Sequence, residues 1–77
     1  MEEKIEQIFR TVMDWEDDVV VDDSMTPNTV EEWDSLVTMT FTIELGKEFD
    51  IKFDYDEIVA MNSIRDIKRI IERKLTR

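Results

Sequence analysis

Apolar side chains recur with helical spacing in three stretches of this 77-residue chain. Over residues 3–14 an apolar residue falls at every third or fourth position, the pattern of a helix with one buried face. A similar pattern predicts a second helix from Ser35 to about Glu48 and a last helix that starts at Ser63. Between them, Asp54 and Glu57 have the spacing of a capping box and predict a short helical turn. The chain is therefore expected to be all-α.

The second predicted helix has a good N-cap candidate in Asp34. On a helical wheel its inward arc is expected to contain Phe41, Leu45 and Phe49, widened by Leu36 and Met39. Val37 then falls among the polar positions, where burial does not explain the presence of an apolar side chain. The polar positions themselves are Thr40, Glu44, Lys47 and Glu48.

Residues 15–34 break the helical pattern and predict a long loop. Its apolar residues Val19, Val21, Met25 and Val30 are the candidates to reach into the core. A loop of about 20 residues is unusual in so small a domain and is often functional. Three longer helices, one short helix and this first loop predict a small four-helix bundle, with residues 1–77 forming a single domain.

Composition excludes several classes of function. The chain has 20 acidic and 10 basic residues, no Cys and no His. It therefore lacks the usual zinc ligands, the usual imidazole base and a thiolate nucleophile. We expect that the protein is not itself an enzyme. A net charge of −10 disfavours nucleic acid, whose phosphates need Lys and Arg.

The distribution of charge and hydropathy adds to this picture. Residues 1–34 hold twelve acidic and two basic side chains, but this stretch lacks the EF-hand pattern, so no metal site is expected. No apolar run is long enough to insert into a membrane, and the acidic start is unlike a secretory signal. A cytoplasmic monomer is expected.

The candidate chemistry lies where the long loop meets the second helix, at Trp33-Asp34-Ser35-Leu36. A hydroxyl in a helix's first turn is commonly a simple cap. No base is available near Ser35 to make it a nucleophile of this chain's own chemistry. An exposed helix-start serine without a base is, however, what a modifying enzyme would need.

At this junction the chain resembles the acyl carrier proteins. The resemblance depends on Asp34-Ser35-Leu36 and the preceding Glu-Glu-Trp, on the segment 44–51, and on Ser63-Ile64-Arg65-Asp66-Ile67. Size, acidity, helix order and the long first loop agree with it over essentially the whole chain. The ordered set is far more specific than the three-residue match alone.

The resemblance implies that Ser35 is esterified with 4′-phosphopantetheine by a phosphopantetheinyl transferase, within the motif formed with Asp34 and Leu36. The arm would carry an acyl group as a thioester for acyl-activating, acyltransferase or ketosynthase-type enzymes of fatty acid, polyketide or related biosynthesis. Two alternatives stay open. One is an aminoacyl or peptidyl carrier, including a D-alanyl carrier, of a nonribosomal-peptide-type or cell-wall pathway; the other is an unmodified helical interaction module.

The resemblance also implies two surfaces. Partner enzymes would dock on the exposed side of the second helix, here less acidic than is usual in the family, at Val37, Thr40, Ile43, Glu44, Lys47 and Glu48. A slot between the second, third and last helices could shelter the acyl chain, although these residues could equally be ordinary core; its candidate lining is Met39, Ile43, Leu45, Ile58, Val59, Met61, Ile64 and Ile67.

Overall fold

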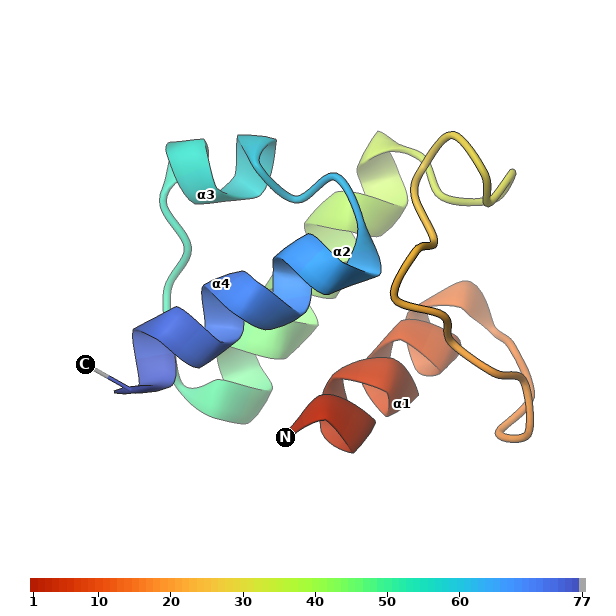
Figure 1. Ribbon diagram of the computed structural model, residues 1–77, viewed down its shortest axis with the longest axis horizontal. Coiled ribbons are helices and arrows are strands. Elements are labelled where there is room, and N and C mark those ends of the chain that lie inside the picture. Colours follow the sequence, from red (N-terminus) through yellow and green to blue (C-terminus); the bar gives the residue numbers. More distant parts are fainter. Residues whose placement is uncertain (77) are drawn as a thin grey trace.

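The computed structural model describes residues 1–76 and contains four helices over that range. They are α1 (Glu2–Met13), α2 (Ser35–Phe49), α3 (Tyr55–Val59) and α4 (Ile64–Thr76). The three longer helices pack together, and short α3 bridges α2 and α4 at one end of the bundle (Figure 1). The all-α prediction is confirmed. Arg77, the last residue of the predicted single domain, lies outside the described residues.

The predicted helix boundaries hold to within one or two residues because the capping signals form as expected. Asp54 Oδ1 accepts a hydrogen bond from Glu57 N at 2.8 Å, and Glu57 Oε1 accepts one from Asp54 N at 2.9 Å, so the capping box is complete. Ser63 Oγ accepts from Asp66 N at 3.0 Å at the start of α4.

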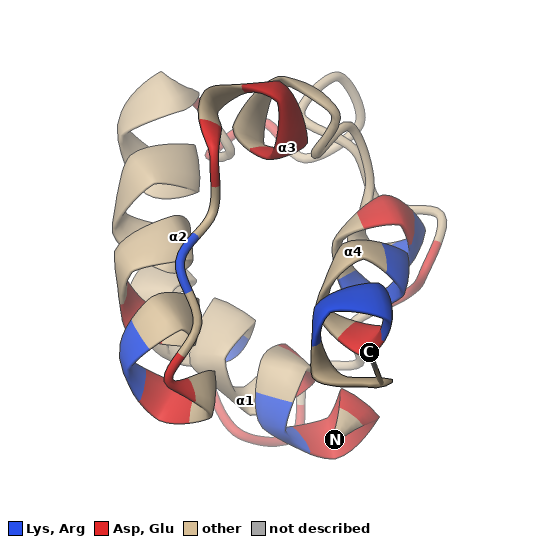
Figure 2. Ribbon diagram, turned by 90° about the vertical axis from the view of Figure 1, so that its left-hand side faces the viewer, with Lys and Arg blue, Asp and Glu red and all other residues tan. Residues whose placement is uncertain are grey.

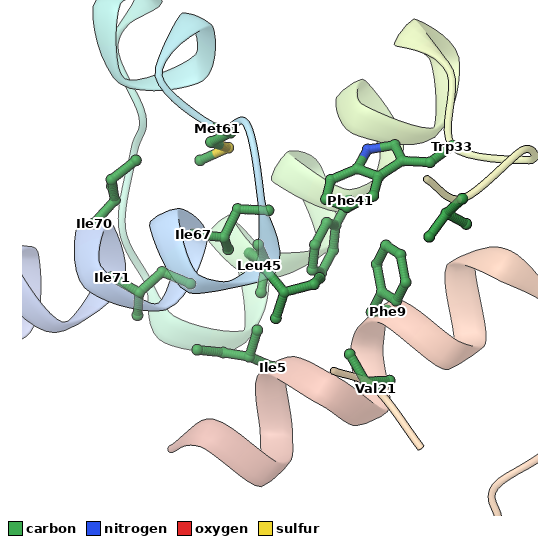
Figure 3. Close-up of a cluster of buried hydrophobic side chains, with 12 residues drawn as sticks. Ile5, Phe9, Val21, Trp33, Phe41, Leu45, Met61, Ile67, Ile70 and Ile71 are labelled. Atoms are coloured by element: carbon green, nitrogen blue, oxygen red, sulfur yellow. The ribbon is translucent and has the colours of Figure 1, made fainter. Parts of the chain in front are cut away.

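One aromatic cluster occupies the centre of the core. The Phe9 ring of α1 lies 5.0 Å from the Trp33 ring and 5.1 Å from the Phe41 ring of α2, measured between centroids. Figure 3 shows these rings side by side, with Leu45 and Ile67 next to them. Aromatic rings bury more apolar area than other side chains, so this cluster contributes a large part of the core's stability.

The long first loop is fixed to the core by its apolar residues, as predicted, although not by all four candidates. Val21 and Val30 are buried and Met25 is half-buried, whereas Val19 lies at the surface. Two backbone bonds also attach the loop to the start of α4, because Ile64 N donates to Met25 O and Arg65 N donates to Asp23 O, each at 3.0 Å. The loop thus has a defined path across the bundle.

A buried cation joins the loop to two helices. Lys68 of α4 is only 8% exposed, and its ammonium group lies 2.7 Å from Glu6 Oε2 of α1 and 2.5 Å from Asp23 Oδ1 of the loop. Loss of hydration acts to lower the pKa of Lys68, but the hydrogen bonds and charges of Asp23 and Glu6 outweigh it and raise that pKa above its ordinary value. Lys68 is therefore held in its charged form.

None of the helices within residues 1–76 is both long enough and apolar enough to span a bilayer.

Candidate functional site

Ser35 is the first residue of α2, and the residue before it fixes how the helix begins. Asp34 has an extended backbone, and its Oδ1 accepts a hydrogen bond from Val37 N at 3.0 Å. Asp34 is therefore the N-cap, as predicted, and its side chain satisfies one amide of the first turn. Asp34, and not Ser35, caps the start of α2.

The Ser35 hydroxyl is exposed and unengaged. No residue of the described range 1–76 forms a hydrogen bond with Ser35 Oγ, and the backbone amides of Ser35 and Leu36 have no partner there either. Unpaired amides at a helix start carry partial positive charge and favour an anion beside them. The hydroxyl thus stands in the open, next to two free donors.

Within residues 1–76 no base contacts this hydroxyl through a hydrogen bond. The sequence has no His and no Cys, and Ser35 Oγ makes no hydrogen bond to any carboxylate or amine of residues 1–76. A serine acts as a nucleophile only with a base to take its proton. The arrangement therefore suits a hydroxyl that another protein modifies, and no catalytic residue is assigned.

The outer face of α2 next to Ser35 is apolar and uncharged. Leu36 is 71% exposed, Met39 59% and Ile43 55%, and residues 35–43 contain no ionisable side chain. The charged residues of α2 gather at its C-terminal end, and the rest of the helix is free of charge (Figure 2). A protein that approaches Ser35 along this face meets apolar side chains.

The wheel drawn from the sequence was wrong about three of these positions. Leu36 and Met39 were expected to face the core but lie outside, and Val37 was expected outside but packs half-buried against the core. At roughly 100° per residue, Val37 shares a face with Phe41 and Leu45, four and eight positions on, whereas Met39 lies roughly 160° away from Phe41.

A hollow opens beside this face, between α2 and the segment that leads into α3. Its volume is about 390 Å³, and Met39, one turn after Ser35, is among its lining residues. The lining is mostly apolar, with Lys52 as its one charged member. The full lining consists of Met39, Thr42, Ile43, Gly46, Ile51, Lys52, Phe53 and Ile58.

Three of the residues predicted to line a cargo slot, Met39, Ile43 and Ile58, do line this hollow. Leu45, Ile64 and Ile67 are instead fully buried in the core, and Met61 is nearly so. Val59, at the end of α3, is 57% exposed and lies outside the lining. The cargo slot itself stays a prediction, with Met39, Ile43 and Ile58 as the members that line this hollow.

We did not predict from the sequence that the segment after α2 lines the hollow. Ile51 and Phe53 alternate with exposed Lys52, a signal of a half-buried extended segment. The lone glycine was a second signal, since a Cβ at Gly46 would lie 2.9 Å from Ile51 O. Only Gly lets the returning chain approach α2 so closely.

The predicted docking residues divide according to their exposure. Thr40, Ile43, Glu44, Lys47 and Glu48 are exposed on α2, whereas Val37 is half-buried and is withdrawn from the set. Lys47 lies 3.7 Å from Glu44, and Lys4 of α1 lies 3.8 Å from Glu48, so both carboxylates have a nearby cation. The charge that α2 presents is small.

Comparison with solved structures finds a similar protein. The chain matches the solution structure of a holo acyl carrier protein from Geobacter metallireducens with a TM-score of 0.85 and 27% sequence identity, over 96% of this chain and 84% of that chain. No family model and no curated protein matches the sequence.

Proposed function

We propose that this acyl-carrier-protein-like chain is a carrier that holds an acyl group as a thioester on a 4′-phosphopantetheine arm attached to Ser35. The solved structure that it matches is that of a holo acyl carrier protein, which supports a carrier and not an enzyme. The protein's own tasks would be to present the cargo, shelter it and be recognised.

The exposed, unbonded Ser35 hydroxyl carries the proposal. In the modification, Ser35 Oγ attacks the phosphorus of coenzyme A that bears the pantetheine. A new P–O bond forms, and adenosine 3′,5′-bisphosphate leaves with the electrons of the broken one. The hydroxyl proton goes to a base of the transferase, since this chain has no His or Cys to accept it.

The residues around Ser35 fit the phosphodiester that this reaction would create. The free amides of Ser35 and Leu36 point out of the start of α2, where the helix dipole favours an anion. When bound, the arm supplies a terminal thiol, which the cysteine-free chain lacks. A tethered thiol also raises the effective concentration of the cargo at each partner enzyme.

The hollow beside α2 supports an acyl cargo over an aminoacyl one. Met39, Ile43, Phe53 and Ile58 give it an apolar lining, which favours burial of hydrocarbon at about 25 cal/mol per Å². An amino acid carries an ammonium group, which would lose its hydration in such a lining. Met side chains also adapt to chains of different shape.

The exposed face of α2 supports docking through apolar contact. A partner at Ser35 would bury Leu36 and Ile43, while the side chains of residues 35–43 offer no charge to steer it. Partners expected on this account are the phosphopantetheinyl transferase and the acyl-activating, acyltransferase or ketosynthase-type enzymes that load and unload the cargo.

Intact-protein mass spectrometry tests the proposal. The purified chain is incubated with a broad-specificity phosphopantetheinyl transferase, Mg²⁺ and coenzyme A. The wild type should gain one phosphopantetheinyl group, and Ser35→Ala should gain none. No gain on the wild type would favour an unmodified interaction module, and loading of the holo form with fatty acids against amino acids separates the acyl from the aminoacyl reading.

A further inference from the structure

Trp33 ties the start of α2 to the core and to the helix itself. Its ring is 2% exposed and packs against Phe9. Its indole Nε1 donates a hydrogen bond to Thr38 Oγ1 at 2.8 Å, across the turn that contains Ser35. Figure 3 shows the indole nitrogen directed toward the start of α2.

Thr38 is in turn hydrogen-bonded to Asp34, the residue before the serine. Its hydroxyl donates to Asp34 O at 3.3 Å, and its backbone N donates to the same oxygen at 3.1 Å. Thr38 Oγ1 thus accepts from Trp33 and donates to Asp34, which uses the hydroxyl in both directions. The backbone on either side of Ser35 is held by side chains, and Ser35 Oγ is left free.

We propose that Trp33 and Thr38 are positioning residues for the modification of Ser35. Neither forms a hydrogen bond with Ser35 Oγ, but their bond fixes the turn from which Ser35 Oγ projects. The inference rests on the proposed carrier function and extends it to residues outside the Asp-Ser-Leu motif.

A fixed turn should act on the rate of modification. If the turn samples several arrangements, only the fraction that presents Ser35 Oγ to the transferase can react, and the rate falls with that fraction. The docking face at Leu36 and Ile43 does not include the Trp33–Thr38 bond. The loss should therefore appear in kcat, with the KM for the carrier little changed.

Four variants test the inference with the transferase assay at a temperature where circular dichroism shows each of them folded. Thr38→Val keeps the shape and removes the acceptor, and Trp33→Phe keeps an aromatic ring against Phe9 and removes the donor. Each should lower kcat by about fivefold with KM changed less than about twofold. Thr38→Ser restores the hydroxyl and should stay within about twofold of the wild type. The double variant Trp33→Phe/Thr38→Val should be no slower than Thr38→Val alone, because Thr38→Val already removes the Trp33–Thr38 bond, together with the bond from Thr38 Oγ1 to Asp34 O.

A matched control comes from α1, where Thr11 Oγ1 donates to Gln7 O at 3.0 Å without any further link. Thr11→Val should leave the rate unchanged. Wild-type rates for Thr38→Val and Trp33→Phe would overturn the positioning role while leaving the carrier proposal standing. A strictly additive double variant would also overturn it, and a wild type that gains no mass would end both proposals together.

Discussion

The Lys68 ammonium group lies 2.7 Å from Glu6 Oε2, although the two residues are 62 positions apart in the chain. This ion pair joins α4 to α1, and Asp23 of the first loop binds the same ammonium group. The three carry one positive and two negative charges, and of the three side chains only that of Lys68 is buried. Such a link fixes the loop that leads to Ser35 as well as the two helices.

Removal of this cation should destabilise the fold. Lys68→Met deletes both charge-assisted bonds and leaves the carboxylates of Glu6 and Asp23 without their shared cation, which we expect to lower the free energy of unfolding by about 1–2 kcal/mol. In a domain of this size each kcal/mol lowers Tm by roughly 4–8 °C. Thermal melts followed by circular dichroism measure the change.

The control for Lys68→Met is Lys4→Met, which removes an exposed pair 3.8 Å long between Lys4 and Glu48. Exposed pairs contribute little, so its Tm should move by no more than a few degrees. Equal effects of the two variants would show that the buried link has no special importance.

The same residue gives the protein a predicted response to alkaline pH. Because Asp23 and Glu6 raise the pKa of Lys68 in the folded state, its contribution to stability is fully present below the unfolded value of about 10.4. That contribution is lost as pH rises through the folded-state pKa. The stability difference between wild type and Lys68→Met should therefore shrink above about pH 10.4, in urea titrations at successive pH values, and a constant difference would contradict the assignment.

The uncharged start of α2 predicts that salt has a mild effect on recognition. Residues 35–43 contain no ionisable side chain, so the exposed face of α2 adds no charge of its own to the acidic residues before Ser35, and kcat/KM of the transferase should fall less than about tenfold between low and high salt. The variant Thr40→Glu adds an acidic group to the exposed face and should make the dependence steeper. A loss of about a hundredfold or more for the wild type would contradict an apolar docking face.

The hollow predicts that a long acyl chain stabilises the folded protein. Contact with Met39 and Ile43 is available only in the folded state, so the acylated form should melt higher than the holo form. The double variant Met39→Gln/Ile43→Gln should lose at least half of that gain, whereas Val20→Gln, an exposed residue of the first loop outside the lining of the hollow, should keep it. Equal melting of acylated and holo wild type would argue that the cargo stays in solvent.

The sequence predicts most of the architecture because its local signals agree with the packing. Asp34 and the Asp54–Glu57 capping box mark two helix starts, and both form the predicted bonds. Helix starts of this kind depend on a few adjacent residues, so their pattern is readable without knowledge of the fold.

The hollow was harder to predict because it depends on residues brought together from different segments. The sequence predicts both Leu45 and Ile58, two apolar residues, as lining of the slot. In the structure Leu45 is buried in the core and Ile58 lines the hollow. The wheel for α2 failed for a related reason, since that helix carries apolar residues on its outer face as well as its inner one. Positions 36 and 39 are exposed but carry the apolar residues Leu and Met. Hydrophobic periodicity alone therefore could not show that these two side chains face outward.

Peptide-level mass spectrometry of the transferase product tests the central claim most directly, because the chain offers only three serines, at positions 24, 35 and 63. Ser24 and Ser63 are each engaged in hydrogen bonds, with Asp22 and Asp66 respectively. The account predicts that the phosphopantetheinyl group is found on the peptide containing Ser35, in the wild type and in Ser24→Ala and Ser63→Ala alike. A group found on another residue, or retained in Ser35→Ala, would contradict it.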